Sequence, residues 1–491
     1  MTSIGIKSYA AYIPRLRMDR AAIAAAHAWA LPGLKGVAKG ERAFGSWDED
    51  SITMSVAAVR DCMRTAAGGS VGALTYASTT PVFADLQNAS LVAAACGLAG
   101  SLSTLDSAGS LRAGTSALIR ALEATAPIDE LKDRPKVASK DALIVAADNR
   151  RAKPGSLQEM HYGAGSFALR TGSDQIIARY LGSAASATVF VDHFRASGQP
   201  YDYAWEERWV RDVGYLKIVP ETVGHLLESK QTPPAAIDFF CLPATLAGVA
   251  TAVARQLKIN PEAVVDNLAA NCGDTGAAHP LMMLGVALER ATAGQKILVV
   301  GFGAGCDALL FEVTAANATY QSAAKVSQAL ARGVTDKSYN KLLSFGGELA
   351  LDWGMRSETD AKTALTQLYR SRDQVVGFVG GKCDACSAIQ FPLMPACVRC
   401  GSTAPMAAAP LADAPARVAT FTADWLMFYP APPLYVGLVQ FDNGARVLME
   451  MVDVDPKNFE VGTPLRMVYR IKESDSLRHY NRYFWKAAPL V

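Results

Sequence analysis

The sequence lacks several features that would assign a protein to a class at once. Its formal net charge is only +2 over 491 residues, so no global charge favours nucleic acid or an anionic membrane. It has no run of about 18 uninterrupted apolar residues that could cross a membrane. Residues 1–14 lack the apolar core of a signal peptide. We therefore expect a cytoplasmic protein without a membrane partner or a nucleic-acid partner.

A cofactor fingerprint is also missing from the most glycine-rich stretch, residues 301–305. A dinucleotide-binding loop needs a third glycine where Cys306 stands, and a helix after it. A strand-like segment, DALLFEV, follows instead. We therefore exclude nicotinamide binding there and expect these glycines to let the backbone approach a site closely.

Apolar residues, by contrast, are abundant, at 50% of the chain. That fraction is enough for large cores, and the length predicts two or three domains. Nine cysteines occur in a chain without a recognisable export signal. A disulfide framework is therefore not expected, and the cysteines are interpreted as ligands, core residues or catalytic groups.

Four cysteines have the spacing of a metal site. They form C-x2-C, a ten-residue gap and a second C-x2-C, at positions Cys383, Cys386, Cys397 and Cys400. Two knuckles of this kind supply four thiolates to one tetrahedral Zn²⁺. Because all four ligands come from the protein, we predict a structural zinc ribbon over 375–405. An iron–sulfur cluster fits this spacing less well.

The segments on either side of the predicted ribbon differ in pattern. Residues 406–491 alternate apolar and polar residues, with a DNG turn at 442–444, which predicts a small β-barrel of the OB type. Barrels of this type often bind oligonucleotides, but no interleaved basic and aromatic pattern supports that role here. Residues 316–374 have helical periodicity and are interpreted as a helical connector.

The first 320 residues contain an internal repeat. A buried strand that ends in a turn and a proline occurs at 72–81 and again at 234–243. An apolar helix, small residues leading into a second helix, and another buried strand follow in both halves. Repeated alternation of strands and helices predicts a duplicated α/β fold with a pseudo-twofold axis. A cleft at that axis is the expected place for a site.

The order of these elements resembles the thiolase superfamily, and within it the archaeal-type HMG-CoA synthase branch. The resemblance spans about 4–315 and is carried by AFGSWDEDSITMSVAA, LRAGT, HYGAGSFALRTG, GDTGAA and GFGAGCDA. KCDACSAIQFPLMPACVRCGS and HYNRYFWKAAP resemble the zinc-ribbon/OB-fold domain that helps such enzymes to bind or channel acyl-CoA. The resemblance implies αβαβα layers, halves at 1–170 and 171–315, and a homodimer.

The resemblance also implies acyl-CoA chemistry. In the family a cysteine is acylated, a histidine and an asparagine form an oxyanion hole, and a glutamate handles the proton. Motif matching places Leu111, Cys241, Asp274 and Thr79-Thr80 at these four positions. Leucine cannot carry an acyl group. We therefore predict aldol or retro-aldol chemistry α to a CoA thioester, with a carbonyl compound as second substrate or product and no acyl-cysteine.

Several side chains near the expected cleft could perform that chemistry. The candidate catalytic residues are Asp274, His279, Cys241, His161 and Tyr162. Each has a structural alternative: Asp274 could cap a helix, His279 could be a core histidine, and Cys241 an inert thiol. In segments that the family places near the CoA entrance, Arg112, Arg195 and Lys217 could pair with CoA phosphates.

Three other functions stay open on the sequence. An acyl-transferring synthase or thiolase could use a shifted nucleophile, Ser110 or a cysteine. A pseudoenzyme could bind acyl-CoA and act as a scaffold for a partner. A nucleic-acid-binding OB and zinc protein would bind oligonucleotides in a salt-sensitive way, and the near-neutral charge disfavours it.

Overall fold

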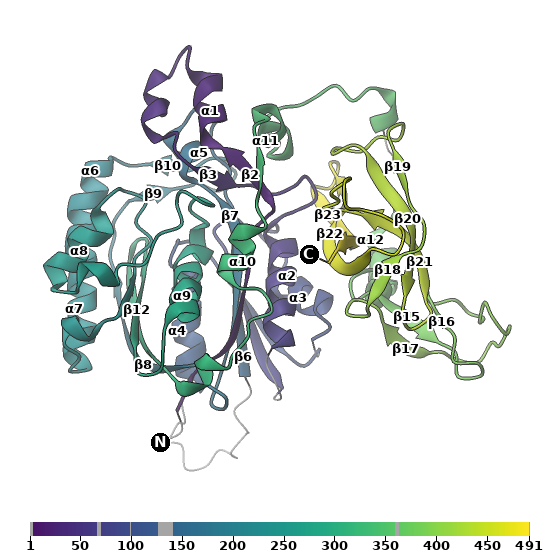
Figure 1. The fold of residues 1–491 in the computed structure, drawn as a ribbon, viewed down its shortest axis with the longest axis horizontal. Coiled ribbons are helices and arrows are strands. Elements are labelled where there is room, and N and C mark those ends of the chain that lie inside the picture. The colour runs from purple at the N-terminus through teal and green to yellow at the C-terminus, as the bar shows by residue number, and fades with distance from the viewer. Residues whose placement is uncertain (1–2, 66–69, 99, 126–140, 359–362, 491) are drawn as a thin grey trace. The chain divides into compact units, whose positions relative to one another are not determined.

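The computed structural model describes residues 3–65, 70–98, 100–125, 141–358 and 363–490. The chain forms two compact units (Figure 1). The first unit comprises Met1–Ser46, Asp50–Ser90 and Gly100–Glu348, and the second comprises Trp47–Glu49, Leu91–Ala99 and Leu349–Val491.

A nine-stranded mixed sheet organises the first unit, in the order β11-β12-β13-β8-β1-β7-β6-β4-β5. Buried apolar runs such as ALIVAA and ILVV supply its central strands, as expected for strands covered on both faces. The strands are β1 (Gly5–Tyr12), β4 (Val71–Ala77), β5 (Ser103–Ser107), β6 (Asp141–Asn149), β7 (Ala164–Gly172), β8 (Ala178–Ala187), β11 (Phe239–Cys241), β12 (Lys296–Phe302) and β13 (Gly305–Val313).

The pairing of these strands confirms the internal repeat. In the first half β4 is parallel to β6, β6 antiparallel to β7, and β7 antiparallel to β1. In the second half β11 is parallel to β12, β12 antiparallel to β13, and β13 antiparallel to β8. The two sets meet where β1 pairs with β8, at Gly5 and Ile6. The same four-strand unit therefore occurs twice.

Helices complete the layers (Figure 1). On the outer faces, α2 (Ser51–Arg64) packs on β1, β6 and β7, and α7 (Val219–Ser229) packs on β8 and β13. Between them, α4 (Ala113–Thr125) and α9 (His279–Arg290) contact each other and strands of both halves. Every residue of α9 from His279 to Leu288 is buried, as a helix inside a protein requires. The predicted αβαβα architecture is thus confirmed.

Shorter elements surround this core. Before residue 349 they are α1 (Arg20–His27), α3 (Asn88–Ala95), α5 (Leu157–His161), α6 (Glu207–Trp209), α8 (Val249–Leu257), α10 (Val326–Ala331), α11 (Tyr339–Phe345), β2 (Leu16–Asp19), β3 (Glu41–Ala43), β9 (His193–Phe194), β10 (Tyr203–Ala204) and β14 (Val334–Asp336). Strand β14 pairs with β2, so the segment interpreted as a helical connector also contributes a strand. The domain boundaries at 170 and 374 stay predictions.

The second unit contains a closed barrel and a small three-stranded sheet. The barrel strands are β18 (Ala416–Val418), β20 (Leu434–Phe441), β21 (Arg446–Met451), β22 (Pro464–Asp475) and β23 (Tyr480–Pro489), and β19 (Thr422–Asp424) lies beside β20. Closure results because β18 pairs with both β22 and β20. The predicted DNG turn joins β20 to β21, with Gly444 at φ 94°. The OB-type barrel is therefore confirmed.

The small sheet carries the cysteine knuckles. Its strands are β15 (Val379–Lys382), β16 (Ile389–Gln390) and β17 (Ala407–Pro410), and the helices α12 (Leu365–Arg370) and α13 (Arg372–Val375) precede it. This arrangement agrees with the zinc ribbon that the spacing predicts.

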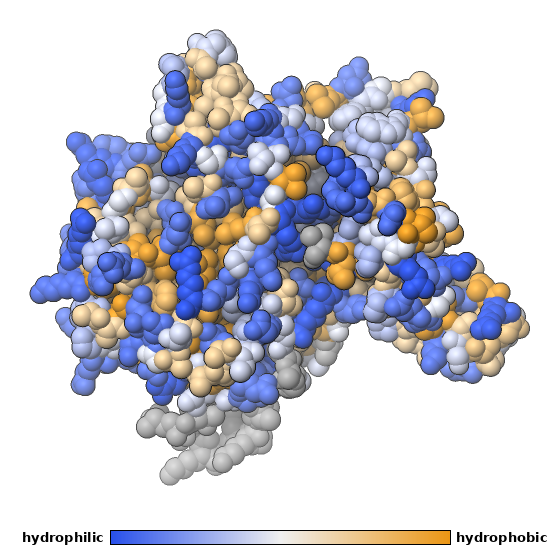
Figure 2. All heavy atoms as spheres, viewed as in Figure 1, coloured by the Kyte–Doolittle hydropathy of each residue, from blue (hydrophilic) through white to orange (hydrophobic). Residues whose placement is uncertain are grey.

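The surface carries hydrophilic side chains over most of the visible face, with smaller groups of hydrophobic residues between them (Figure 2). In the described parts of the chain, no helix is long and apolar enough to cross a bilayer.

A buried carboxylate fixes the strand ends that surround the candidate site. Asp148, near the end of β6, accepts six hydrogen bonds of 2.7–2.9 Å. The donors are the Ser78 hydroxyl, the amides and hydroxyls of Thr79 and Thr80, and the Ala277 amide. Since Ala277 belongs to the second half of the repeat, Asp148 ties both halves together at one point.

Replacing Asp148 with alanine should lower the free energy of unfolding by about 3–5 kcal/mol, because several buried donors would lose their acceptor. Urea-induced unfolding measures the effect. The exposed Glu123 on α4, which pairs with Arg120, is the matched control. Glu123→Ala should change stability by less than about 1 kcal/mol. Equal losses in the two variants would contradict the role given to Asp148.

Candidate active site and metal centre

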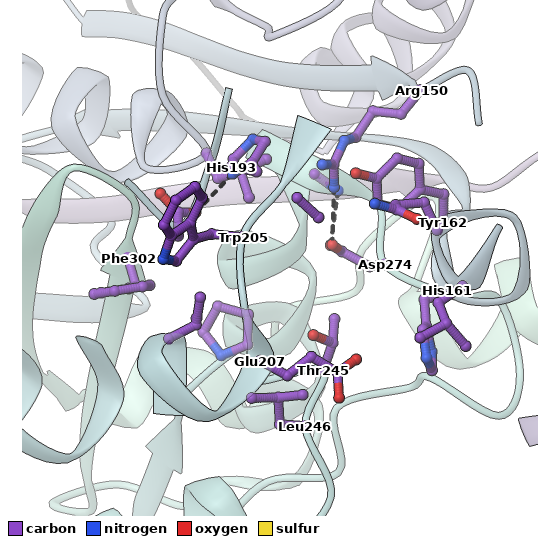
Figure 3. A pocket seen from close by; sticks show the side chains of 18 of the residues that line it. Arg150, His161, Tyr162, His193, Trp205, Glu207, Thr245, Leu246, Asp274 and Phe302 are labelled. Atoms are coloured by element: carbon purple, nitrogen blue, oxygen red, sulfur yellow. Dashed lines mark hydrogen bonds and ion pairs between the residues drawn. The ribbon is translucent and has the colours of Figure 1, made fainter. Parts of the chain in front are cut away.

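A cavity of about 340 Å³ lies in the first unit, where the two halves of the repeat meet. Its wall is built from the residue two before α4, the segment after β6, the end of α5, the segment after β11, the turn before α9 and the end of β12. The residues from these segments are Leu111, Arg150, His161, Tyr162, Pro243, Asp274 and Phe302. Figure 3 labels Arg150, His161, Tyr162, Asp274 and Phe302 among them. The cavity therefore occupies the cleft that the repeat predicts.

Leu111 lines this cavity just before the first turn of α4. The turn between β12 and β13 approaches it closely. A Cβ atom on Gly303, which has φ 154°, would lie 2.8 Å from Ser110 Oγ and 3.2 Å from the Leu111 amide nitrogen. Ser110 Oγ donates a 2.7 Å hydrogen bond to the Gly303 carbonyl. These distances confirm that glycine is needed here for close backbone approach.

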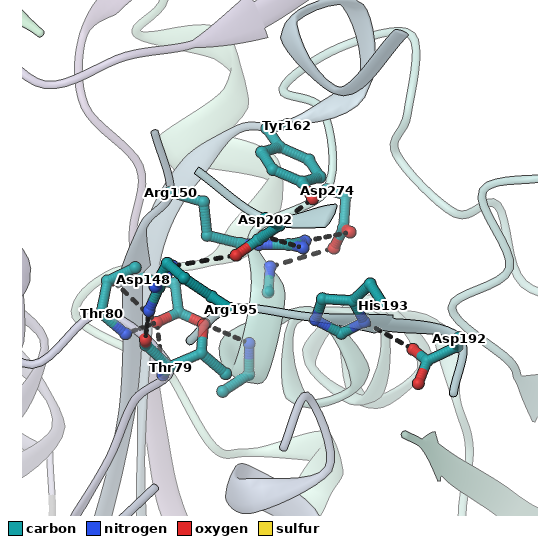
Figure 4. A network of polar contacts seen from close by, with 12 residues as sticks. Thr79, Thr80, Asp148, Arg150, Tyr162, Asp192, His193, Arg195, Asp202 and Asp274 are labelled. Carbon is teal, nitrogen blue, oxygen red and sulfur yellow. Dashed lines mark hydrogen bonds and ion pairs between the residues drawn. The ribbon is translucent and has the colours of Figure 1, made fainter. Parts of the chain in front are cut away.

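An arginine that the sequence analysis did not identify organises the polar wall (Figure 4). Arg150 Nη1 donates to Asp274 Oδ2 at 3.0 Å, and Nη2 donates to Asp202 Oδ2 at 2.9 Å. Its guanidinium carbon lies 3.6 Å from the centre of the Tyr162 ring. The Tyr162 hydroxyl donates to Asp202 at 2.9 Å. One buried cation thus holds two carboxylates and one aromatic ring in place.

Protonation in this network follows from burial and charge. Burial alone would raise the pKa of Asp202, but Arg150 and the hydrogen bond from Tyr162 outweigh it and lower that pKa. Burial raises the pKa of Tyr162, so its phenol stays protonated. Burial, followed by the charge of Arg20, lowers the pKa of His161 and leaves a neutral imidazole at neutral pH.

Asp274 caps a turn and lies on the cavity wall, and its catalytic role stays a prediction. Its Oδ1 accepts the Gly276 amide at 3.0 Å, which caps the turn before α9, and the residue also lines the cavity. His279 is different, because Nδ1 accepts the Thr275 amide at 3.1 Å and Nε2 donates to the Asn267 carbonyl at 2.7 Å. With both nitrogens engaged in the core and no contribution to this cavity wall, His279 fits the structural alternative.

Cys241 also lies in the core. It is fully buried at the end of β11, and burial raises the pKa of its thiol. The cavity wall takes Pro243 and Thr245 from the segment that follows, and does not include Cys241. The geometry therefore favours an inert thiol.

The three basic residues considered for CoA phosphates have different surroundings. Arg112 is engaged internally, with Nη1 donating to Asp307 at 2.7 Å and Nε to the Gly303 carbonyl at 3.1 Å. Arg195 Nη1 donates to Asp202 at 3.0 Å. Lys217 is exposed on the helix Val210–Ile218. Of the three, Lys217 has the exposure that a phosphate contact needs.

A second cavity of about 190 Å³ shares part of its wall with the first. Asp192 and His193 line both cavities, and Ser110, Arg195 and Asp202 line the second. His193 Nδ1 lies 2.6 Å from Asp192 Oδ2 (Figure 4). This pair is not among the predicted site residues, although an acidic residue beside a histidine is an indication that the sequence offers.

The cysteine cluster has the dimensions of a zinc site. The four Sγ atoms lie within 4.8 Å of one another, with Cys383–Cys400 at 3.7 Å and Cys386–Cys397 at 3.6 Å. Tetrahedral bonds of about 2.3 Å to zinc would separate the sulfurs by roughly 3.8 Å. The four thiolates therefore fit Zn²⁺.

Backbone geometry supports this assignment. The two knuckles close in the same way, since the Ser387 amide donates to the Cys383 carbonyl at 2.8 Å and the Gly401 amide to the Cys397 carbonyl at 2.9 Å. Backbone amides of Cys400 and Arg399 lower the pKa of Cys397 to about 6. A pocket whose four sulfur atoms already lie close together suits a structural metal.

A duplicated, five-layered α/β body with a cleft between its halves defines a protein of the thiolase fold. Residues 227–313 match the family model "3-Oxoacyl-[acyl-carrier-protein (ACP)] synthase III C terminal". Residues 410–470 match the family model "ChsH2, C-terminal OB-fold domain". The chain is also similar to a solved structure of MvaS in complex with 3-hydroxy-3-methylglutaryl coenzyme A. That likeness has a TM-score of 0.60 and 18% identity, and covers 70% of this chain and 92% of the other.

Two named relatives identify the family to which the chain belongs. Hydroxymethylglutaryl-CoA synthase of Methanopyrus kandleri is 30% identical over 319 residues, which cover 63% of this chain and 88% of the relative. The enzyme of the same name from Caldivirga maquilingensis is 27% identical, over 69% of this chain and 95% of the relative. The chain belongs to the hydroxymethylglutaryl-CoA synthase family, with an additional C-terminal OB-fold domain.

The purified protein should contain one zinc ion per chain, and Cys386→Ser should lose it, because three thiolates bind zinc more weakly than four. Elemental analysis by mass spectrometry measures the content. Cys96, which lies outside the cluster, provides the control variant Cys96→Ser with full zinc content. Full occupancy in Cys386→Ser, or no zinc in the wild type, would contradict the assignment.

Arg150→Met should lower the free energy of unfolding at pH 7 by about 3–5 kcal/mol, because Asp274 would lose its cation and Asp202 would keep only Arg195. The folded-state pKa of Asp202 is lowered, so its contribution is complete above about pH 4 and is lost as the pH falls through that lowered pKa. The difference in the free energy of unfolding between Arg150→Met and the wild type should therefore become smaller at acidic pH.

Denaturant unfolding at several pH values tests this. The neighbouring Arg151, which is 45% exposed and pairs with Glu348, is the matched control. Arg151→Met should cost less than about 1 kcal/mol. A difference for Arg150→Met that stays constant from neutral to acidic pH would contradict the electrostatic explanation.

Proposed function

We propose that this protein makes or breaks a carbon–carbon bond at the α-carbon of a CoA thioester through an enolate, without an acyl-enzyme. The overall reaction is an aldol addition or its reverse, with a carbonyl compound as second substrate or product. Family membership supports the CoA thioester as substrate class, because the relatives are named for hydroxymethylglutaryl-CoA synthesis.

The observation that carries the proposal is Leu111. Motif matching assigns Leu111 to the position of the cysteine that accepts the acyl group in the family, and Leu111 lines the cavity two residues before α4. A hydrocarbon side chain has no nucleophile to acylate. The chemistry that needs no acyl-enzyme, proton removal at the α-carbon and addition of the enolate to a carbonyl, can remain.

The surroundings suit an enolate. The N-terminal end of α4 lies next to Leu111 and favours negative charge on a thioester oxygen. Asp274, paired with Arg150, lies on the wall together with the neutral His161 and the protonated Tyr162. Lys217 is the proposed contact for CoA phosphate, and Cys241 and His279 support the strand and helix ends. A homodimer and a cytoplasmic location stay predictions.

A second candidate is an acyl-transferring condensation that uses Ser110, and family membership favours it. Against it, Ser110 Oγ donates to the Gly303 carbonyl and lines the second cavity rather than the first. Acyl transfer through Ser110 predicts an acylated peptide that contains this residue after incubation with acyl-CoA.

Incubating the protein in D₂O with acetyl-CoA, propionyl-CoA and longer thioesters should place deuterium at the α-carbon, because the base removes and returns a proton there. Mass spectrometry of the recovered thioesters measures the exchange. Asp274→Asn should slow it about 10-fold or more, and the protein-free solution sets the background. Binding of CoA without any exchange across this series would contradict the proposal and favour a scaffold.

A further inference from the structure

Asp192 and His193 lie where the two cavities of the first unit meet. We propose that His193, oriented by Asp192, is the catalytic base that moves the proton between the α-carbon of the thioester and the β-oxygen of the aldol. This inference rests on the proposed function and names the group that performs its proton transfer.

The wall residues show that the two cavities adjoin along three segments. Leu111 lines the first cavity and Ser110 the second, Phe302 the first and Gly303 the second, whereas His193 lines both. A β-hydroxyacyl thioester could extend from one cavity into the other. The bond between its α- and β-carbons would then lie beside the imidazole. Figure 3 shows the His193 side chain on the wall of the first cavity, on the same side as Trp205.

The hydrogen bond to Asp192 determines what the imidazole can do. The 2.6 Å contact makes Nδ1 the protonated nitrogen, since the carboxylate can only accept. Nε2 then carries the lone pair, and among the described residues it has no hydrogen-bond partner. A histidine with one nitrogen held by a carboxylate and the other open to a cavity has the arrangement of a general base.

Other histidines of this unit differ in that respect. His279 uses both ring nitrogens within the core. His161 lines the first cavity but has no orienting carboxylate within the described residues, and burial and Arg20 keep it neutral. His193 combines an orienting carboxylate with access to both cavities, at 19% side-chain exposure.

Several charged groups line the two cavities together with the imidazole. The charged side chains on the two cavity walls are Asp192, Asp202, Asp274, Glu207, Arg150 and Arg195. Asp202 and Asp274 are paired with Arg150, and Arg195 with Asp202. Asp192 is the carboxylate that accepts a hydrogen bond from the imidazole.

The proposed step is balanced without any other reactant. In the cleavage direction, Nε2 takes the proton from the β-hydroxyl of a β-hydroxyacyl thioester, and the oxygen becomes a carbonyl as the bond between the α- and β-carbons breaks. The electron pair of that bond forms the thioester enolate. Nε2 then returns the same proton to the α-carbon. The addition direction reverses each step, and nothing is oxidised or reduced.

His193→Gln should lower kcat for α-deuteration and for cleavage by about 10²–10⁴-fold with KM changed only a few-fold, as expected for loss of a general base. The dependence of kcat on pH should also change. Asp192→Asn keeps the ring but removes its orienting carboxylate, and should produce a smaller loss with a displaced pH profile.

His225, exposed on α7, provides the matched control, and His225→Gln should retain wild-type rates and pH profile. Thermal unfolding of each variant separates loss of chemistry from loss of fold. Asp192→Asn serves as the second test if His193→Gln does not fold. Unchanged rates and pH profiles in both His193→Gln and Asp192→Asn, with an active wild type, would overturn this inference alone. A wild type that neither exchanges nor cleaves any thioester would overturn the proposed function and this inference together.

Discussion

The candidate site depends on one buried carboxylate, that of Asp148. Six hydrogen bonds converge on it from the end of β4 and from the turn before α9, so two parts of the repeat that are far apart in sequence are fixed at one point. Gly276 has to be a glycine in this arrangement, because a Cβ there would lie 2.2 Å from Asp148 Oδ2 and its φ is 62°. The charge of Asp148 and the backbone conformation of Gly276 together thus hold the end of β4 against the turn before α9.

The position of Asp148 also determines the position of Arg150, which organises the polar wall of the cavity. Arg150 comes two residues after Asp148, and from there it reaches Asp202 and Asp274 on two other segments. Each carboxylate is buried at a cost that the shared cation offsets. This pairing leaves Asp192 to orient His193 and leaves Leu111 facing a cavity with few free charges. The same constraints that stabilise the fold therefore define the groups available for chemistry.

Much of the architecture could be predicted from the sequence, because nearby residues determine the pattern of each strand and helix. These patterns also occur in the same order in both halves. The cysteine spacing and the position of Leu111 before α4 were also readable locally. His279 and Cys241 were predicted as site residues, yet both lie in the core. Their positions in the sequence do not reveal whether their side chains point into the cavity or into the core. Arg150 was missed because its partners, Asp202 and Asp274, lie on other segments and meet it only in the folded chain. His193 was missed although its partner, Asp192, is the preceding residue, because only the fold places this pair on the wall of both cavities.

The claim that Leu111 removes the acyl-enzyme is tested most directly by the intact mass of the protein. Wild type and Leu111→Cys would be incubated with acetyl-CoA, quenched in acid and weighed by mass spectrometry. The wild-type mass should stay unchanged, and Leu111→Cys should gain one acetyl group, because a thiol would then stand just before α4. An acetyl group on the wild-type protein would contradict the claim.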